Sequence, residues 1–478
     1  MNNTYYEQGR LVCFDDYQKK HNLFYFKAAN NFPWSSFTEI ANEFKCFSYE
    51  SLRCQTLIRR KRNNKDNICF DFNVDKNSSV DGIDNSSKYR RLSKAGRRPF
   101  HFWPTFRAFV MSRFMRVENS VKDVYFLLEN NPTFADACGF NNSVPSYRSL
   151  ARFDQIMSNK GLWAKTRRLV VELNLKNNVF SLEGTIAVDT THVEAESVPV
   201  PKDSEQKPTC DNVGVMRKSK TVTHIAHKIS IIGFPKSDLP LIGTVHPGGM
   251  PDNATLKPSL EQLIKEYPRL TNLIEDILAD GIYQTKDNHE IVELLFGEGT
   301  RLVAPINPRN HKDKILTDVP GITIINKYGC PKCISGHKMF LLSRDLKRDQ
   351  YIWGCPVFNS KFRGKSVTCP KASHAICCNC NKNGRVFRTN RHDYPQIHWE
   401  YPQHSLKHII EYRQRSSSER INSTLKEGFG FRRVHKQNKS NVEAHVDKCI
   451  AAVHIVAYMA HFLGKPELMR SWSKIMVA

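Results

Sequence analysis

The sequence predicts an α/β protein with a helical N-terminal part and a cysteine-rich insertion. Apolar residues recur at helical spacing from Phe100 onward, and from Gly184 the pattern changes to β-branched runs typical of strands. Seven of the fourteen cysteines fall between Cys330 and Cys380. At 478 residues, the chain is long enough for about three domains of about 150 residues each.

The charge balance is strongly basic. The 71 Lys and Arg residues exceed the 47 Asp and Glu residues, which gives a formal net charge of +24 and an isoelectric point near 9.5. Such an excess favours a polyanionic partner, most commonly nucleic acid. No apolar run approaches the roughly 18 residues that a membrane span needs, and the N-terminus lacks the layout of a signal peptide. We therefore expect a cytoplasmic protein with no membrane partner.

Residues 1–95 are predicted to form a basic N-terminal region and linker. Its aromatic-rich part, Leu11 to Phe47, is expected to pack as a small helical layer. The polar, Ser- and Asn-rich stretch that follows becomes basic at its end. It fits an arm that lies along DNA and a disordered linker equally well.

Residues 96–180 are predicted to form a helical DNA-binding domain. Helices are expected over residues 102–117, 120–128, 132–139 and 147–157. Ser120 with Asp123 forms a capping box, Pro132 suits a first helical position, and Ser146 can cap the last helix. That last helix carries Arg148 and Arg152 on its outer side. Short helices followed by a basic one fit a helix-turn-helix, and an ordinary helical bundle would look similar.

Residues 181–314 are predicted to form the first part of an RNase H-like core. Strands are expected at 184–193, 224–234, 239–249 and before Asp280, with helices at 258–267 and at 289–296, the second of which leads into RLVAPINP. This order is that of an RNase H-like core, although other mixed sheets share it. Asp189 and Asp280 are expected to end the first and fourth strands. Because the carboxyl ends of strands converge on one crevice, the two carboxylates should meet there.

A Cys-rich, zinc ribbon-like insertion is expected over residues 315–396, and the C-terminal helices of the core over 397–478. The last long helix should begin at a capping box of Ser440 and Glu443 and end at Gly464 and Pro466. Its buried face should hold Val446, Ile450, Val453 and Ala457.

A single helix from Glu411 to Gly428 is predicted to carry the functional side chains Tyr412, Arg415, Glu419 and Lys426. Around a helix, Tyr412, Arg415 and Lys426 lie at roughly +20°, −40° and −20° from Glu419. All four side chains therefore share one narrow stripe. The carboxylate can hold a metal ion while the two cations grip phosphates. A solvated helix with an i,i+4 ion pair is the simpler alternative.

Three carboxylates are therefore candidates for one metal site: Asp189, Asp280 and Glu419. Together they could hold two Mg²⁺ (or Mn²⁺) ions about 3.5–4 Å apart, a pair that activates water or a 3′-hydroxyl in phosphodiester transfer. Oxygen ligands without His or Cys suit magnesium. Either aspartate alone would be read as a turn or a helix cap.

The spacing Tyr412-x2-Arg415-x3-Glu419-x6-Lys426 resembles the Tyr-Arg-Glu-Lys signature of DDE transposases from bacterial and archaeal insertion sequences. IAVDTTHVEA and LADGIYQ resemble that family's first and second acidic motifs, and AGRRP followed by NNSVPSYRSLARF is similar to its N-terminal helical domain. The likeness covers roughly 94–463. The gap 419 − 280 = 139 is long, as in family members whose core is interrupted by an insertion.

The resemblance implies that Asp189, Asp280 and Glu419 are the metal-binding catalytic triad, and that Tyr412, Arg415 and Lys426 contact the phosphates of the element ends. Such enzymes cut double-stranded DNA at the element ends and join them to a target, usually as a homodimer or larger complex. A nucleoid-associated location follows. The alternatives are an RNase H-like nuclease without strand transfer and a non-catalytic, transposase-derived zinc-ribbon regulator.

The clustered cysteines indicate a structural zinc site. Cys330 and Cys333 form a CxxC pair, and Cys377 with Cys380 is the likeliest second pair among five competing cysteines. Free buried thiols are the alternative. Trp353 and Trp399 lie in or beside the insertion, where relatives that form hairpin ends stack a Trp on a flipped base, although a core Trp is commoner.

Overall fold

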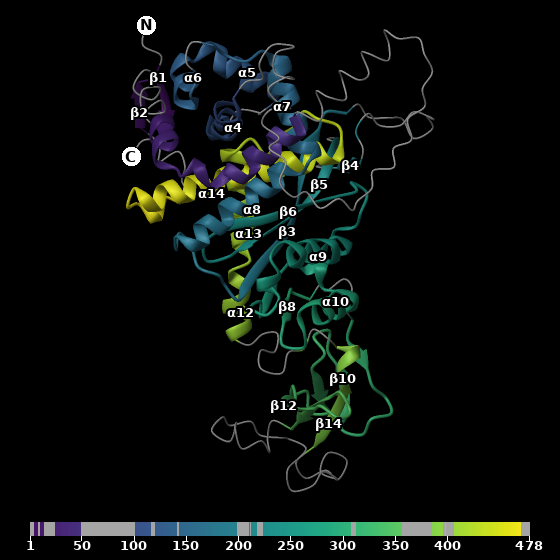
Figure 1. Ribbon diagram of the computed structural model, residues 1–478. Coiled ribbons are helices and arrows are strands. Elements are labelled where there is room, and N and C mark those ends of the chain that lie inside the picture. Colours follow the sequence, from purple (N-terminus) through teal and green to yellow (C-terminus); the bar gives the residue numbers. More distant parts are fainter. Residues whose placement is uncertain are drawn as a thin grey trace, which may run out of the picture. The chain divides into compact units, whose positions relative to one another are not determined.

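We describe the protein from a computed structural model, shown in Figure 1, in two compact units. The first unit comprises Met1–Glu172, Gly428–Gly430 and Asp447–Ala478, and the second comprises Leu173–Glu427 and Phe431–Val446. The structure describes residues 4–7, 10–13, 24–48, 101–115, 120–140, 143–197, 210, 212–217, 223–306, 312–355, 385–394, 397 and 406–469.

The first unit is mainly helical, as the sequence predicts. Residues 24–31 and 38–48 are helical, followed by α4 (Phe102–Met111), α5 (Val121–Asn130), α6 (Pro132–Cys138), α7 (Tyr147–Asn159) and α8 (Leu162–Lys176). The expected caps are present: Ser120 and Asp123 form the capping box, and Ser146 accepts from the backbone of Ser149. A short hairpin of β1 (Thr4–Glu7) and β2 (Arg10–Cys13) was not expected.

The first expected helix is shorter than the sequence pattern suggests. α4 ends at Met111 and tightens into the 3₁₀ helix η2 (Ser112–Met115), where the Ser112 hydroxyl donates to the carbonyl of Phe109. A serine hydroxyl bound to a nearby carbonyl competes with the regular helix ladder, which explains the change.

The long helix α14 (Lys439–Phe462) is buried over most of its length. Its expected face is inside, with Val446, Ile450, Val453 and Ala457 all at most 2% exposed. The capping-box prediction is wrong, because the helix already includes Lys439 and Ser440 therefore lies within its first turn. Gly464 closes the helix with φ of 69°, a left-handed conformation that glycine adopts without a steric penalty.

A buried ionic network lies among α7, α8 and α14 of the first unit. Lys448 Nζ is 2.9 Å from Asp154 Oδ1, which also accepts from Trp163 Nε1 at 2.9 Å. Arg167 Nε is 2.6 Å from Asp447 Oδ1. The Lys448 ammonium also lies over the Trp163 ring, 5.2 Å from its centre. Each buried charge thus has a partner, which burial requires.

The second unit contains a mixed seven-stranded sheet (Figure 1). Its strands are β3 (Thr185–Ala195), β4 (Gly214–Arg217), β5 (Thr223–Phe234), β6 (Leu239–His246), β7 (Asp276–Leu278), β8 (Arg301–Val303) and β15 (Arg433–Val434). β5 is antiparallel to β3, β4 and β6, whereas β7 and β15 run parallel to β3, and β8 parallel to β7. Without the short strands β4 and β15, the strands lie side by side in the order β6-β5-β3-β7-β8. Numbered along the chain, these five strands are the third, second, first, fourth and fifth.

The helices of the second unit cover this sheet. α9 (Leu256–Glu266) packs against β5 and β6, and α10 (Lys286–Phe296) packs against α9 and β8. β6 is buried at every residue, which explains its continuous apolar pattern. α12 (Leu406–Arg413) contacts β8, and α13 (Ser416–Gly428) follows it along the chain.

The insertion forms two three-stranded antiparallel sheets. One contains β9 (Lys314–Ile315), β10 (Ile322–Ile325) and β11 (Pro331–Cys333), and the other β12 (Phe340–Asp345), β13 (Gln350–Gly354) and β14 (Val386–Asn390). Trp353 is 1% exposed in their core and donates its Nε1–H to Thr389. The base-stacking role considered for Trp353 is therefore wrong, because its ring is covered. Trp399 lies outside the described residues.

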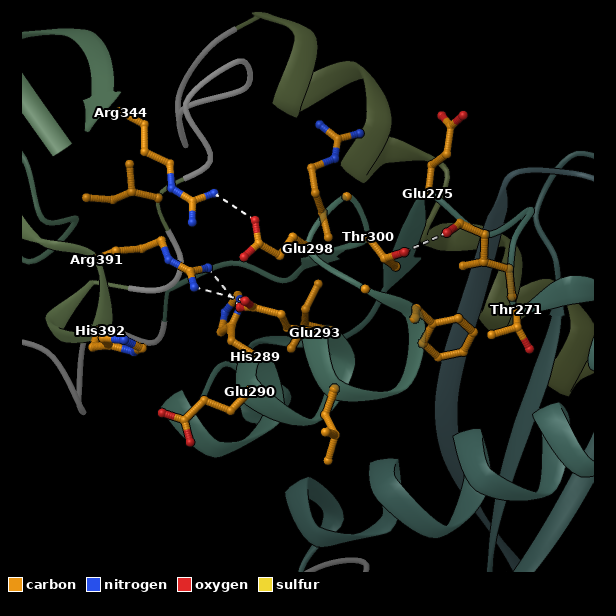
Figure 2. Close-up of a pocket in the computed structure, with 18 of the residues that line it drawn as sticks. Thr271, Glu275, His289, Glu290, Glu293, Glu298, Thr300, Arg344, Arg391 and His392 are labelled. Atoms are coloured by element: carbon orange, nitrogen blue, oxygen red, sulfur yellow. Dashed lines mark hydrogen bonds and ion pairs between the residues drawn. The ribbon is translucent and has the colours of Figure 1, made fainter. Parts of the chain in front are cut away.

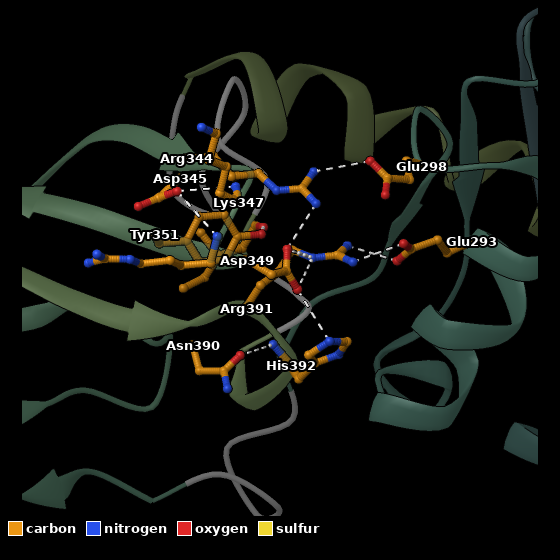
Figure 3. Close-up of polar contacts among 12 residues, drawn as sticks. Glu293, Glu298, Arg344, Asp345, Lys347, Asp349, Tyr351, Asn390, Arg391 and His392 are labelled. Carbon is orange, nitrogen blue, oxygen red and sulfur yellow. Dashed lines mark hydrogen bonds and ion pairs between the residues drawn. The ribbon is translucent and has the colours of Figure 1, made fainter.

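An arginine joins the insertion to α10 (Figure 3). The Arg391 guanidinium donates to both Glu293 oxygens at 2.8 and 2.9 Å, and its Nε donates to Asp349 at 2.8 Å. Asp349 also accepts from Arg344 at 3.0 Å. The bond from Arg391 holds the pKa of Glu293 below its usual value.

Across the described residues, we find no helix that could cross a membrane.

We predict that Asp154→Ala destabilises the first unit by about 3–5 kcal/mol, because it removes the carboxylate that pairs with the buried Lys448 ammonium. Both side chains are at most 5% exposed. Urea unfolding followed by Trp fluorescence measures the loss. As a control, Glu261→Ala removes an exposed i,i+4 pair with Lys257 and should cost less than about 0.5 kcal/mol. A loss below about 1 kcal/mol for Asp154→Ala would contradict the prediction.

We also predict acid sensitivity from His246 of β6, which is 2% exposed and bonds Ser230 and Ser259. Burial, with Lys228 and Lys439, lowers its pKa from 6.5 to about 4. Between these values the unfolded chain binds a proton that the folded chain does not, so the free energy of unfolding falls as pH falls, by at most about 3 kcal/mol.

His246→Gln should reduce this pH dependence between pH 6.5 and 4, because glutamine keeps a donor for the serines and does not titrate. Thermal unfolding across that range measures it. An unaltered slope in His246→Gln would show that His246 does not cause it.

Candidate active site

The register of two parallel strands places Asp189 and Asp280 level with each other. Ala187 of β3 pairs with Leu278 of β7, and each aspartate lies two residues beyond its strand's paired residue. Asp280 follows β7, as predicted. Asp189 does not end its strand, because β3 continues to Ala195 through its pairing with β5 and β15. The expected strand end is thus wrong, although the juxtaposition remains.

Helix α13 is fixed to the sheet at two points. Arg420 Nε and Nη2 donate to the two oxygens of Asp238 at 2.7 and 2.8 Å, in the turn between β5 and β6. Ile421 packs directly over Gly233 of β5, where an added Cβ would come within 2.6 Å of its Cδ1 atom. Glu419 lies in the first turn of α13, where the helix dipole favours a carboxylate.

The predicted single helix is broken at Gln414 and Arg415, between α12 and α13. The break has a local cause. Backbone N–H groups here bond three residues back, as from Arg415 to Tyr412 at 2.9 Å, and the Ser418 hydroxyl donates to the Arg415 carbonyl at 2.9 Å. Serine hydroxyls compete with the helix ladder in this way. The prediction of one straight stripe is therefore wrong.

The break places the Arg415 guanidinium among three carboxylates. Its Nη1 lies 2.7 Å from Glu419 Oε1, and its Nη2 lies 3.7 Å from Asp189 Oδ1 and 3.6 Å from Asp280 Oδ2. The side chain of Asp189 is 18% exposed, compared with 54% for Asp280 and 64% for Glu419. The structure thus brings together the three predicted acidic residues around one cation, with one carboxylate deep and two near the surface.

The electrostatics of this site favour added positive charge. Burial raises the pKa of Asp189, and the carboxylates of Asp280 and Glu419 raise it further, while Arg415 opposes the shift. Burial works against the charged form of Arg415, but the surrounding acids outweigh it and its pKa is raised. Three carboxylates and one guanidinium leave a net negative charge.

Asn422 is a site residue that the sequence reasoning missed. Its Nδ2 donates to Asp189 Oδ2 at 3.0 Å, and the residue is 8% exposed. It follows Glu419 by three residues, so it lies about 60° away around the same helix. Helical spacing from Glu419 could have identified it, but a lone Asn in a polar helix gives no signal of its own.

The remaining residues of the predicted signature occupy different surroundings. Tyr412 of α12 is half-buried and packs against an apolar cluster of Ala187, Leu278 and Val303. Burial raises its pKa. Lys426 is half-buried near the end of α13, two turns beyond Glu419, and its charge contributes last to the lowered pKa of His192, after burial.

Arg148 and Arg152 lie on α7, the predicted recognition helix. Arg148 is exposed and Arg152 is partly exposed. Their outward placement agrees with the sequence expectation.

The donor set suits a hard cation, since all three acidic side chains supply oxygen. Among the described residues, however, no three His, Cys, Asp or Glu side chains form a ready metal-binding group. The Arg415 guanidinium lies between the carboxylates instead. Metal binding there would therefore require this side chain to move aside, and the fit to magnesium rests on donor chemistry alone.

The structure describes two of the four cysteines predicted to bind zinc, Cys330 and Cys333. Cys333 is 5% exposed, while Cys330 packs partly against the apolar core around Trp353, and burial raises the pKa of its thiol. Cys377 and Cys380 lie outside the described residues.

A second feature of this unit is a cavity of about 1170 Å³ between α10 and the insertion (Figure 2). It is lined by paired charges such as Glu293 and Arg391, and by His289, whose Nε2 is buried without a hydrogen-bond partner. Burial lowers the pKa of His289 to about 4. Because its walls carry both signs of charge, the cavity favours no one class of ligand.

No protein-family model matches this chain, and no curated protein matches it. Among solved structures, the chain is similar to a structure described as a cryo-EM structure of the piggyBac transposase synaptic complex with hairpin DNA. The TM-score is 0.36 and the identity 9%, over 78% of this chain and 71% of that one. A likeness this low carries no argument about fold or activity.

Proposed function

We propose that this protein is a DDE transposase of the insertion-sequence type, which cleaves DNA at the ends of its element and joins them to target DNA. One observation carries the proposal: Arg415 lies within 3.7 Å of carboxylate oxygens from Asp189, Asp280 and Glu419. These acids come from β3, the loop after β7 and α13, so only folding brings them together. Charged groups gathered at such cost to desolvation are typical of functional sites.

The sheet supports an RNase H-like core as the scaffold. In the order β6-β5-β3-β7-β8, β5 runs antiparallel to β3, and the first and fourth of these strands along the chain, β3 and β7, are parallel neighbours. That neighbourhood is what makes Asp189 level with Asp280. The insertion enters after β8, so the long gap between Asp280 and Glu419 is spanned by the two small sheets.

In the proposed reaction, Asp189, Asp280 and Glu419 would hold Mg²⁺ or Mn²⁺. A bound pair of such ions would polarise the attacking hydroxyl and stabilise the leaving oxygen in phosphodiester transfer. The protein's own contribution is to fix the carboxylates: Asp189 by its strand, Asp280 by the turn it caps, and Glu419 by its anchored helix. No step requires any of these acids to act as a nucleophile.

Double-stranded DNA is the proposed partner, with phosphates gripped by Arg415 and Lys426 and approached by Tyr412. Arg415 is suited to a phosphate oxyanion because its planar fork already points at negative charge. Arg148 and Arg152 on α7 would contact the element ends, supported by the net charge of +24. Assembly as a homodimer or larger complex on DNA is part of the same proposal, as is a nucleoid-associated location.

We predict that Glu419→Gln abolishes Mg²⁺-dependent cleavage and joining while leaving DNA-end binding intact, because it removes a metal ligand and also a charge that repels phosphate. A strand-transfer assay on the element's own ends measures this. The control is Glu427→Gln, at an exposed glutamate on the same helix that pairs with exposed Arg432. Cleavage without joining by the wild-type protein would instead favour the nuclease. Full strand transfer by Glu419→Gln would mean that the acid is misassigned.

Lys426→Ala is predicted to weaken DNA-end binding and to lower the slope of log affinity against log salt by about one counterion, because one phosphate contact is lost. A filter-binding salt titration measures the slope. Lys257→Ala, at an exposed lysine on α9, should leave it unchanged. An unchanged slope in Lys426→Ala would show that Lys426 makes no phosphate contact and is only a solvated residue of the helix.

We propose, in addition, one structural zinc ion held by Cys330, Cys333 and a second cysteine pair, with Cys377 and Cys380 as candidates. Cys333→Ser should lower the zinc content from about one ion per chain toward zero in protein purified without chelator, as measured by elemental analysis. Cys138→Ser, at a buried cysteine of α6, is the control. Absence of zinc from the wild-type protein would refute this site.

A further inference from the structure

We infer that Asn422 is a positioning residue for Asp189, which holds this carboxylate so that it and Glu419 can face one divalent cation. The inference rests on the proposed function and adds a residue to that site. Asn422 is not among the four residues of the sequence signature, and its role follows from contacts alone.

The two oxygens of Asp189 are held by different groups. Asn422 Nδ2 donates to Oδ2 at 3.0 Å, whereas Oδ1 lies 3.7 Å from Arg415 Nη2, and the Thr190 backbone N–H also bonds the carboxylate. Only the NH₂ end of a carboxamide can donate to a carboxylate, which assigns the orientation of the Asn422 side chain. The bond to Oδ2 limits rotation of the carboxylate and leaves Oδ1 directed toward the cationic centre.

The same bond sets the distance between two parts of the site. Glu419 and Asn422 lie three residues apart and therefore on neighbouring positions of α13. Asp189 lies 233 residues from Asn422 in the chain, on β3. A hydrogen bond between them ties the site end of α13 to β3 and so fixes how far Glu419 stands from Asp189. Arg420, another anchor of α13, instead bonds Asp238 in the turn between β5 and β6.

Packing alone does not explain an asparagine at this position. Asn422 is 8% exposed, and its Oδ1 is buried without a hydrogen-bond partner among the described residues. An unsatisfied buried acceptor costs free energy, which an apolar side chain of similar shape would avoid. Leucine at this position would keep the packing and remove only the polar contact. Groups that orient a metal ligand typically change metal affinity 10–100-fold when removed.

The test measures Mn²⁺ binding to the full chain without DNA, by electron paramagnetic resonance of free Mn²⁺. We expect Glu419→Gln to abolish binding and Asn422→Leu to weaken it about 10–100-fold. Ser417→Ala, which alters another buried polar side chain of α13 without touching Asp189, should change it less than about two-fold. Thermal unfolding in EDTA checks that Asn422→Leu folds, although loss of the hydrogen bond to Asp189 should lower its melting temperature. Should it fail to fold, Asn422→Ala takes its place.

A second readout separates positioning from packing. In cleavage assays, Asn422→Leu should need about 10–100-fold more Mn²⁺ for half-maximal rate, with a rate at saturating Mn²⁺ close to wild type and unchanged DNA binding in EDTA. A residue that only packs would not move the Mn²⁺ dependence. Wild-type Mn²⁺ affinity in Asn422→Leu, with loss in Glu419→Gln, would overturn the inference alone. Equal absence of Mn²⁺ binding in wild type and Glu419→Gln would overturn the proposed metal site, and the inference with it.

Discussion

The pairing of β3 is the constraint on which the candidate site depends. This strand pairs with β5 along most of its length, with β7 at its beginning and with β15 at its end. Between the two parallel partners, Asp189 faces the loop that follows β7 and the helix that follows the break at Arg415. A slip of one residue in the β3–β7 register would turn one aspartate to the opposite face of the sheet and separate the pair.

Charged side chains are paired one to one in the buried network of the first unit, and only partly at the candidate site of the second. In the first unit, Lys448 and Asp154 neutralise each other beneath aromatic rings. In the second, one guanidinium faces three carboxylates, so pairing is incomplete and the pKa of Asp189 is raised. The first arrangement needs no further partner. The second retains negative charge, which is why it is the better candidate for binding a cation and, through Arg415, a phosphate.

Much of the secondary structure could be predicted from the sequence. The capping residues Ser120 and Ser146 act within their own helices, and the β-branched runs became β3, β5 and β6 close to the expected bounds. The two-residue strand β15 could not be predicted, because it is a strand only through its pairing with the end of β3. The break before α13 could not be predicted for a different reason. The spacing of apolar and charged side chains gives no information on whether a serine hydroxyl will bond a backbone carbonyl, as that of Ser418 does.

For the candidate site, the sequence by itself determined which acidic and basic side chains are available. The spacing of Tyr412, Arg415, Glu419 and Lys426 is a local pattern, and so is the position of Asp189 and Asp280 in or after a predicted strand. The tertiary structure decided their relations. It placed Asp189 within a strand, directed Arg415 to the carboxylates, buried Trp353 in a core and added Asn422. These outcomes depend on contacts between residues distant in the chain, from 36 positions for Trp353 and Thr389 to 233 for Asp189 and Asn422, and periodicity carries no information about such contacts.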